Sequence, residues 1–475
     1  MCGVDSSTSA TKVELRDADD GALLGSGRVS HPVTTPPRSE QDPSAWWDAL
    51  QEASRLAIRD ADARGAGVHA VECVGIGAQQ HGMVVTDAAG RPLRPAKLWN
   101  DTESADAARE LVDERGAQWW AQRVGSVPVA AFTVTKLAWL REHEPSTWSQ
   151  LTRIGLPHDW LVHQLTGRWA TDRGDASGTG YWSDARGYDA DVLAGLDSAR
   201  DWGTCLPEVL APHEPAGPML LSSLELPGSP LVSAGTGDNM AAALALGLIP
   251  GDICFSLGTS GTVFAVAAEQ SGDASGAVAG FADATGHYLP LVCTLNASKV
   301  IDTMTRLLGV SPEEFDALAL AELPTAHDAV LVPYFDGERT PNRPDATGSL
   351  LGLRTNVGRE EVARATVTGV LCGLLAGLDA LSSARVPVDG RVFLIGGGAR
   401  SAAARQLLAD LLGRPVTPVS GELVARGAAI QAAVASGHGS FADVAGRWAG
   451  DVADPVLPRP VNATGIRLRY ASAAG

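Results

Sequence analysis

Cysteine, lysine and long apolar runs are all scarce in this chain, and each shortage excludes a class of protein. The six cysteines among 475 residues lie far apart, so no C-x-x-C pair exists for a zinc site or a redox motif. They are expected to be buried, reduced thiols. No apolar run reaches the ~18 residues that a membrane span needs, and the first residues lack a basic and apolar leader. The sequence therefore predicts a soluble, cytoplasmic protein without a membrane partner.

The small number of lysines also excludes the commonest phosphate-binding loop. No lysine lies in a G-x-x-x-x-G-K-[ST] motif, and the four are Lys12, Lys97, Lys136 and Lys299. Glycine pairs of the G-x-G type begin at Gly75 and Gly235, but neither has the third glycine of a dinucleotide fingerprint. No H-E-x-x-H motif or nucleophile elbow occurs. Any nucleotide site must therefore be built from Gly, Ser, Thr and Asp.

Basic residues are too few to form a nucleic-acid surface. Lys and Arg number 37 against 55 Asp and Glu, so the net charge is 37 − 55 = −18, and no segment gathers a basic stripe. A nucleic-acid partner is therefore disfavoured. Apolar residues at 45% and charged residues at 19% are ordinary for a globular protein, and 475 residues predict two or three domains.

One local pattern occurs twice. Residues 3–15 have the pattern of a strand, a tight turn rich in hydroxyl groups and a second strand, and residues 253–264 repeat it. Thr259 takes the place of Thr8, which is a separation of 259 − 8 = 251 residues. A repeat of this length predicts two similar α/β halves rather than a solenoid. A cleft between the halves is the expected ligand site.

The regions around the repeats indicate parallel α/β sheets and two domains. Strand-like runs at 70–77 and 391–398 end in glycine or polar turns and alternate with helical patterns. The proline-rich stretch 207–230 predicts an irregular connection. We place the boundary near residue 245, which gives domains of residues 1–245 and 246–475.

The two hydroxyl-rich turns suit a phosphate chain. Short side chains let backbone N–H groups approach phosphate oxygens, while Ser and Thr hydroxyls donate further hydrogen bonds. Asp5, beside the first turn, adds a carboxylate that suits Mg²⁺, directly or through water. The alternatives are an ordinary hairpin turn and a turn-capping Asp.

Asp238 follows a predicted strand and the turn Gly235-Thr236-Gly237, at the start of an alanine-rich helix. A helix N-terminus favours the ionised carboxylate, and exposure at a strand end would let it accept a substrate proton. The alternative is an N-cap that satisfies backbone donors only.

Three further segments carry candidate ligand contacts. Gln80 and His81, in a strand-end loop, offer uncharged hydrogen-bonding groups for a polyhydroxylated ligand, although a single His is more often structural. Trp99 lies beside Asn100 and Asp101 and could form a sugar face, although most tryptophans are core residues. The glycines 396–398 would let a flat ring or a phosphate lie against the backbone, or would form an ordinary βα turn.

These motifs, in this order, resemble the FGGY carbohydrate kinases. The resemblance extends to about residue 435. The residues that carry it are Asp5–Lys12, Gln79–Gly82, Trp99–Asp101, Asp175–Thr179, Gly235–Asn239, Leu257–Gly261, Pro333–Pro341 and Gly396–Arg400, with Ser39–Pro43 before Trp46 and Trp47.

The resemblance implies a duplicated, actin-like (ribonuclease-H-like) α/β fold, with ATP and the sugar bound in the cleft between two domains. By the same resemblance Asp238 is the general base and Asp5 a catalytic aspartate that holds Mg²⁺. The other residues that it implies are Gln80, His81, Trp99 and Asn239 with Asp238 for the sugar, Thr8, Ser9, Thr11, Lys12, Gly258 and Thr259 for phosphates, and Gly397 and Gly398 for adenosine.

Three positions depart from the family pattern. Gln80 stands where the family usually has Met, Glu103 where it usually has Arg, and Ser7 where Gly is common. We expect the first two changes to alter sugar contacts or a nearby ion pair. None of the three removes the proposed base, the aspartate for Mg²⁺ or the phosphate turns.

The resemblance therefore implies an enzyme that uses ATP and Mg²⁺ to phosphorylate a small sugar, and D-xylulose is the expected acceptor. The alternatives are another pentulose or a polyol, such as ribulose or ribitol, and, from a different class, an actin-like or chaperone-like nucleotide switch. Discrimination between similar sugars depends on a few hydrogen bonds. An enzyme of this size is expected to be a homodimer.

Overall fold

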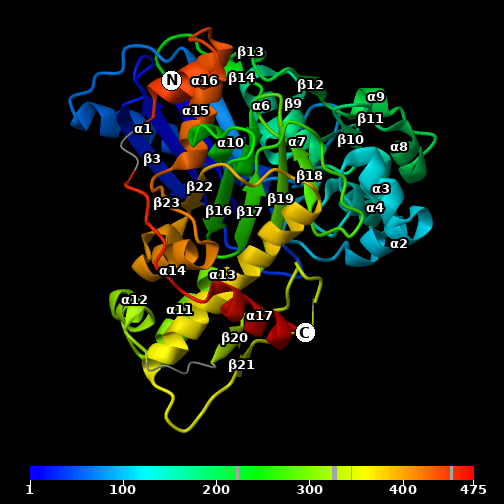
Figure 1. The fold of residues 1–475 in the computed structure, drawn as a ribbon. Helices are drawn as coiled ribbons and strands as arrows, with labels where there is room; N and C mark the ends of the chain where they lie inside the picture. The colour runs from blue at the N-terminus through cyan, green and yellow to red at the C-terminus, as the bar shows by residue number, and fades with distance from the viewer. Residues whose placement is uncertain (221–223, 324–328, 344, 450–452) are drawn as a thin grey trace. The chain divides into compact units, whose positions relative to one another are not determined.

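The chain forms two compact units, each of which combines separate stretches of sequence (Figure 1). The computed structural model describes residues 1–220, 224–323, 329–343, 345–449 and 453–475. Unit 1 consists of Met1–Leu248, Ala268–Leu289 and Glu422–Ala449, and unit 2 of Ile249–Ala267, Pro290–Gly421 and Gly450–Gly475. The boundary expected near residue 245 divides the sequence once, whereas two later segments of the chain belong to unit 1.

Unit 1 is built on a seven-stranded sheet in the order β13-β14-β5-β1-β2-β3, with β15 also paired to β5. Strands β1, β2 and β3 form an antiparallel meander, while β5 runs parallel to β1 and to β14. The strands are β1 Cys2–Ser6, β2 Ala10–Arg16, β3 Leu23–Ser30, β5 Cys73–Ala78, β13 Pro215–Pro218, β14 Leu231–Ser233 and β15 Thr236–Gly237.

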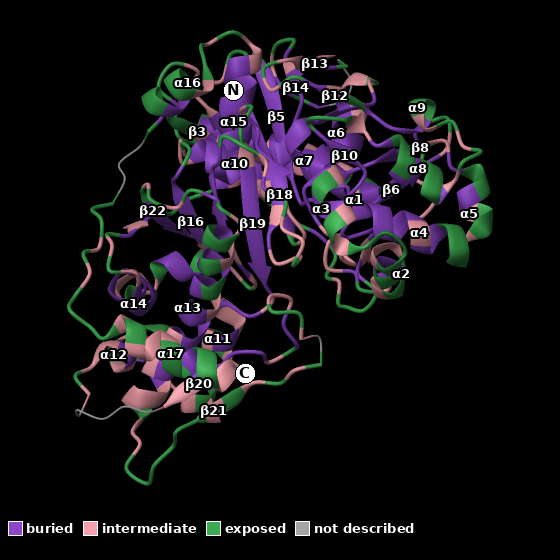
Figure 2. Cartoon of the chain, turned by 45° about the vertical axis from the view of Figure 1, so that its right-hand side comes forward, coloured by how far each residue is buried: buried purple, intermediate pink, exposed green. Residues whose placement is uncertain are grey.

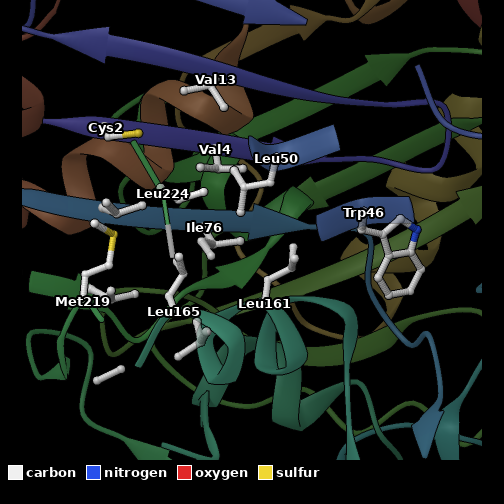
Figure 3. Packing of buried hydrophobic residues seen from close by; sticks show 14 of the residues in the cluster. Cys2, Val4, Val13, Trp46, Leu50, Ile76, Leu161, Leu165, Met219 and Leu224 are labelled. Atoms are coloured by element: carbon white, nitrogen blue, oxygen red, sulfur yellow. The ribbon is translucent and has the colours of Figure 1, made fainter. Parts of the chain in front are cut away.

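The two faces of this sheet are covered by different helices. Alternate residues of a strand point to opposite faces, so Val4 and Ile76 join the apolar cluster with α1 and α6 (Figure 3). A side-chain carbon on the next residue, Gly75, would lie 1.9 Å from the carbonyl oxygen of Ala428 in α15. The small residues thus let α15 pack directly on the sheet. The helices are α1 Pro43–Ala63, α6 Pro157–Thr166, α10 Asp238–Ala245 and α15 Leu423–Ala435.

The prediction of an irregular connection over 207–230 is wrong in part. This stretch contains β12 (Glu208–Leu210), which pairs with β9 (Ala170–Asp172), and β13 at one end of the main sheet. A proline lacks an N–H but costs no ladder hydrogen bond on an edge strand, which is why β13 tolerates two of them. Residues 221–223 lie outside the described part of the chain.

Unit 2 repeats the same pairing pattern. Its strands follow the order β19-β17-β16-β22-β23, with two antiparallel pairs and then two parallel pairs, as in β3-β2-β1-β5-β14. The predicted duplication of an α/β unit is therefore confirmed. The strands are β16 Ile253–Leu257, β17 Gly261–Ala265, β19 Tyr288–Thr294, β22 Val392–Ile395 and β23 Thr417–Pro418.

One long apolar helix crosses unit 2. By length and composition α13, Arg359–Ser383, passes the test for a membrane span, and it is the only helix among the described residues to do so. The prediction that no segment reaches this length is therefore wrong. Two thirds of its apolar window is buried, and the helix packs against α11 (Ser298–Leu308), α12 (Pro312–Leu320) and β20 (Val330–Val332).

The central strands of both sheets are buried, while exposed residues lie on the shorter helices and on the connecting loops (Figure 2). The remaining elements are β4 Glu40–Gln41, β6 Val84–Thr86, β7 Ala96–Lys97, α2 Ala105–Arg115, α3 Ala117–Val124, α4 Thr133–His143, α5 Pro145–Gln150, β8 Arg153–Gly155, α7 Arg173–Ser177, β10 Trp182–Ser183, β11 Gly187–Tyr188, α8 Ala190–Leu196, α9 Trp202–Cys205, β18 Ala279–Ala282, β21 Ser349–Leu351, η1 Gly397–Arg400, α14 Ala402–Leu412, α16 Phe441–Arg447 and α17 Ala463–Ala474.

Candidate active site

Asp5 and Lys12 form a charge pair across the first hairpin. They lie opposite each other in the β1–β2 ladder, and Lys12 Nζ donates to Asp5 Oδ2 at 3.1 Å. The same ammonium lies 2.6 Å from Glu422 Oε2, at the residue before α15. One cation therefore joins two carboxylates that are 417 residues apart in the sequence (422 − 5 = 417).

The second oxygen of Asp5 is left without a partner. Asp5 is buried, and its Oδ1 has no hydrogen-bond partner among the described residues. Burial raises the pKa of this carboxyl, while Lys12 opposes that effect. A buried carboxylate oxygen without a donor is the kind of ligand that a hard cation takes.

The turn of the first hairpin is held by side chains from other parts of unit 1. Thr8 Oγ1 donates to Gln79 Oε1 at 3.0 Å and accepts from Trp99 Nε1 at 2.9 Å. Thr11 is buried, and its hydroxyl lies 2.8 Å from His31 Nε2. Ser9, at the tip, is exposed. The hydroxyls of Thr8 and Thr11 thus support the turn, and the backbone and Ser9 form its outer surface.

Gln80, Asn239 and Asp238 form a hydrogen-bonded chain. Asn239 Nδ2 donates to Gln80 Oε1 at 3.0 Å and to Asp238 Oδ1 at 2.8 Å, and the backbone N–H of Asn239 also reaches Asp238 Oδ1 at 2.7 Å. β15 pairs with β5 beside Gly77 and Ala78, which brings the two strand-end loops together. Three residues predicted to contact the sugar are therefore adjacent.

The carboxyl of Asp238 lies at the N-terminus of α10 and is partly exposed. Burial and the charge of Asp5 raise its pKa to about 7, although the two donors of Asn239 act in the opposite direction. A carboxyl with this pKa can gain and lose a proton near neutral pH, as a general base must.

His81 has a fixed orientation in the same loop. Its backbone φ is 64°, an uncommon conformation for a residue other than glycine. The Nδ1–H donates to the carbonyl of Gly178 at 2.8 Å, and the ring packs against Phe132 and Phe281 at centroid distances of 5.1 and 5.3 Å. Hydrogen bonding through Nδ1 fixes the ring in place and directs Nε2 away from Gly178.

In unit 2, the second hairpin turn and the glycine turn lie side by side. Thr259 is exposed at the tip of the β16–β17 turn, and Gly258 N–H donates to Ser260 O at 3.1 Å. A side-chain carbon on Gly398 would lie 2.2 Å from Leu257 Cδ2, so the glycine turn packs directly against the end of β16. Gly397, in the same turn, is exposed. The predicted phosphate and adenosine residues of unit 2 therefore form one surface.

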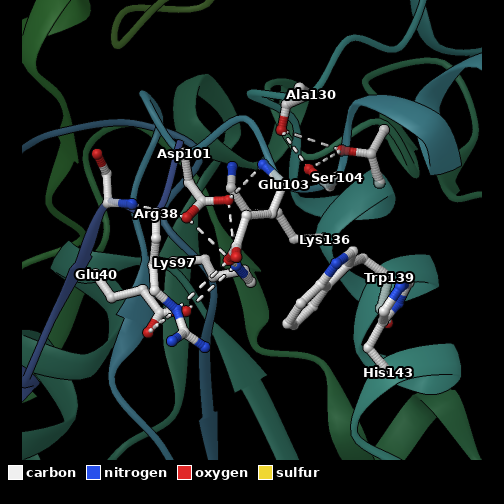
Figure 4. A network of polar contacts seen from close by, with 12 residues as sticks. Arg38, Glu40, Lys97, Asp101, Glu103, Ser104, Ala130, Lys136, Trp139 and His143 are labelled. Atoms are coloured by element: carbon white, nitrogen blue, oxygen red, sulfur yellow. Dashed lines mark hydrogen bonds and ion pairs between the residues drawn. The ribbon is translucent and has the colours of Figure 1, made fainter. Parts of the chain in front are cut away.

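The departure at Glu103 produces an ion pair (Figure 4). The buried ammonium of Lys97 pairs with Glu103 and lies 3.2 Å from Glu40 Oε1 and from Asp101 Oδ1. Burial alone would raise the pKa of Glu103, but Lys97 lowers it. The three carboxylates are close enough to hold a cation, and here the lysine supplies that charge.

Two residues of this site were missed from the sequence. Glu422 reaches Lys12 across 410 residues, and no local pattern could pair them. Gln79 lies within the motif that carries Gln80 and His81, but its own part, the hydrogen bond to Thr8, depends on the parallel pairing of β1 with β5.

The fold and this site define an actin-like phosphotransferase of two α/β domains, in which hydroxyl-rich and glycine turns accompany buried carboxylates. The profiles of the N-terminal and C-terminal domains of the FGGY family of carbohydrate kinases match residues 1–245 and 253–436. The chain belongs to this family and is a carbohydrate kinase, which implies ATP as its phosphate donor.

Proteins named xylulose kinase are similar to this chain over almost its whole length. Those of Streptomyces rubiginosus and Streptomyces coelicolor are each 46% identical, over 96% of this chain and 92% of the relative. The crystal structure of xylulose kinase from Bifidobacterium adolescentis has a TM-score of 0.85 at 38% identity, and the match covers 100% of this chain and 99% of that one.

Proposed function

We propose that this enzyme transfers the γ-phosphoryl group of ATP to the C5 hydroxyl of D-xylulose and so makes D-xylulose 5-phosphate. The names of relatives that are 46% identical over 96% of the chain support this acceptor. A homodimeric, cytoplasmic enzyme is part of the proposal.

The predicted residues take the following parts in this proposal. Residues 1–245 bind the sugar and one side of the phosphate chain, and residues 246–475 bind adenosine and further phosphate oxygens. Asp238 acts as general base, Asp5 as the Mg²⁺ aspartate, Gln80, His81, Trp99 and Asn239 as sugar contacts, Thr8, Ser9, Thr11, Lys12, Gly258 and Thr259 as the phosphate turns, and Gly397 and Gly398 as the adenosine surface.

The observation that carries the proposal is the link from Asp238 to Gln80 through Asn239. It holds a carboxyl with a pKa of about 7 next to uncharged groups that suit hydroxyls. A sugar bound at Gln80 and Asn239 would present a hydroxyl to Asp238, which removes its proton as the oxygen attacks phosphorus. Phosphoryl transfer depends mainly on such positioning and on neutralisation of charge.

The residues around Asp5 fit a magnesium ion. Among the described residues its buried Oδ1 has no donor, and Lys12 contacts only Oδ2, so one oxygen is available to the ion directly or through water. Mg²⁺ would neutralise charge on the phosphates. Lys12 would do the same from the adjacent strand.

The experiment is ADP release with Mg·ATP and one acceptor at a time: D-xylulose, D-ribulose, L-ribulose, ribitol, glycerol or gluconate, each compared with no acceptor. We expect D-xylulose to give the largest kcat/KM. A different preferred acceptor would contradict the sugar but retain the kinase, and Gln80 is then the first residue to test. ATP turnover that no acceptor stimulates would contradict the whole proposal and favour a nucleotide switch.

A further inference from the structure

A buried histidine lies among three aspartates behind the loop that carries Asp238. His158, near the start of α6, is fully buried, and its Nδ1 lies 2.8 Å from Asp175 Oδ2. Its Nε2 lies 3.1 Å from Asp159 Oδ1 and 3.8 Å from Asp172 Oδ1. The three aspartates are themselves at most 1% exposed.

This cluster contacts the Asp238 loop directly. A side-chain carbon on Gly235, which has a φ of 78°, would lie 2.5 Å from His158 Cδ2, so the imidazole packs against the backbone of the loop. The next residue, Thr236, donates from Oγ1 to Asp172 Oδ2 at 2.8 Å. The cluster therefore contacts two consecutive residues of the loop, which lie three and two positions before the proposed base.

The cluster also reaches the sugar loop through α7. Asp172 caps this helix, accepting from the backbone N–H groups of Gly174 and Asp175 at 2.9 Å each. The residue after the helix is Gly178, whose carbonyl accepts from His81 Nδ1. His158 holds Asp175 in the middle of α7, so one side chain connects the supports of both loops.

Stability alone explains this arrangement poorly. Burial by itself would lower the pKa of His158, but Asp159, Asp175 and Asp172 raise it to about 9, which favours the charged ring. It lies at a helix N-terminus, where a cation is unfavourable. Buried ion clusters cost desolvation free energy and are often no more stabilising than apolar residues of the same volume, whereas they do fix geometry through directional contacts.

We propose that His158 is a positioning residue for phosphoryl transfer: through Asp172 and Asp175 it keeps Asp238 and His81 in the relative arrangement that the transfer requires. This inference rests on the proposed function, because it takes Asp238 as the base and His81 as a sugar contact. His158 acts on neither substrate directly.

The test compares His158→Gln with His163→Gln. His163 lies five residues further along α6 (163 − 158 = 5), is only partly buried and packs edge-on against Trp169 at 5.0 Å. We expect His158→Gln to lower kcat with D-xylulose by about 10- to 100-fold, the size of a misplacement of about 1 Å. The KM for ATP should stay close to wild type, whereas the Tm should fall, because removing one member of a buried ion cluster leaves the others unpaired. The value of kcat is therefore measured at a temperature at which the variant is folded. His163→Gln should retain kcat.

A second variant tests the connection itself. Thr236→Val removes only the hydroxyl that reaches Asp172 and should lower kcat by about tenfold. If both residues act through this connection, the double variant His158→Gln/Thr236→Val should be no slower than the slower single variant. Multiplied losses would mean independent effects and would contradict the proposal.

The outcomes separate this proposal from the function on which it rests. A wild-type enzyme that no acceptor stimulates would overturn both. An active wild type together with an equally active His158→Gln would overturn the positioning role only. The positioning role would also be overturned if His158→Gln and His163→Gln lost Tm to the same extent and lost kcat in proportion to it. Should His158→Gln fail to fold, Thr236→Val decides: unchanged kcat overturns the proposal.

Discussion

The two hairpins of the duplicated fold have the same topology but different chemistry. In unit 1, Asp5 and Lys12 face each other across β1 and β2, and one oxygen of the buried carboxylate has no partner in the part of the chain that the structure describes. In unit 2, the same place in the ladder is taken by Ser256 and Thr262. One hairpin thus carries a charge pair and the other a pair of hydroxyls.

The loops after the parallel strands differ in the same way. β5 leads into Gln79, Gln80 and His81, whose side chains make hydrogen bonds within unit 1. β22 leads into three glycines that present backbone and pack against Leu257. In the duplicated fold, the loop of unit 1 thus carries hydrogen-bonding side chains, whereas the glycines of unit 2 would let a ligand approach the backbone closely. This division suits an acceptor site in one unit and a nucleotide surface in the other.

The largest expected effect tests whether acceptor chemistry belongs to unit 1. Asp238→Asn keeps the shape of the side chain but removes the proposed base, so the sugar-dependent kcat should fall by about 10³-fold. ATP binding, measured by calorimetry, should be retained. Asp191→Asn, which changes an exposed aspartate in the first turn of another helix, should retain activity. Normal turnover by Asp238→Asn would disprove the assignment of the base.

The next prediction contrasts the equivalent positions of the two hairpins. Lys12→Met leaves the buried carboxylate of Asp5 without its cation and removes a positive charge from the proposed phosphate turn, so kcat should fall by about 10²-fold. Thr262→Val, at the corresponding position of unit 2, should change kcat by no more than about twofold. Equal losses in steady-state assays of the two variants would show that the hairpins contribute alike and would remove the distinction drawn above.

The pH dependence provides a third test. The pKa of Asp238 is raised to about 7 by burial and by Asp5, and a base must be ionised to accept a proton. The sugar-dependent kcat should therefore reach a plateau above pH ~8 and fall about tenfold per unit below pH ~7. The residual activity of Asp238→Asn should lack this limb.

The raised pKa of Asp238 also predicts how the stability of the folded protein changes with pH. Folding disfavours the ionised form of a carboxyl whose pKa is raised, so the stability that protonated Asp238 contributes is lost as the pH rises from about 3.8 to about 7. Asp238→Asn should gain Tm relative to wild type across this range and keep a constant advantage above it. A wild type whose Tm relative to the variant does not change with pH would contradict the shift.

A smaller effect is expected for the backbone surface of unit 2. The new methyl group in Gly398→Ala would overlap Leu257, so the glycine turn should move and the KM for ATP should rise about fivefold. The KM for the sugar should not change. Gly446→Ala, where a side-chain carbon meets nothing within 4 Å, is the matched control. An effect on the sugar alone would contradict the division between the units.

Local patterns were sufficient to predict both hairpins, the duplication and the position of Asp238. Each depends on short-range preferences: glycine and hydroxyl residues at tight turns, and a carboxylate at a strand-to-helix junction. The recurrence of one pattern after 251 residues also indicated two similar units, which the matching strand orders confirm.

Contacts between distant segments could not be predicted in this way. Glu422 pairs with Lys12, and Thr236 with Asp172, only because β1, β5 and the surrounding helices bring them together. The hydrogen bond from Trp99 to Thr8 likewise gives the indole N–H a partner within the protein, and contact of its ring with the sugar stays a prediction. Buried titratable residues such as His158 resemble ordinary helix residues in the sequence, because burial is a property of the fold.

The smallest expected effect concerns Gln80, where the family usually has Met. Its Oε1 accepts from Asn239, but its Nε2 is buried without a partner among the described residues, and an unpaired buried donor costs free energy unless a ligand accepts from it. Gln80→Met should therefore raise the KM for the preferred sugar about threefold to tenfold, the value of one neutral hydrogen bond, and leave the KM for ATP unchanged. Assays of the variant against D-xylulose and D-ribulose separate two explanations. A uniform loss would mean that Nε2 binds a hydroxyl that the two sugars share, and a change in their ratio would mean that this amide contributes to the choice of acceptor.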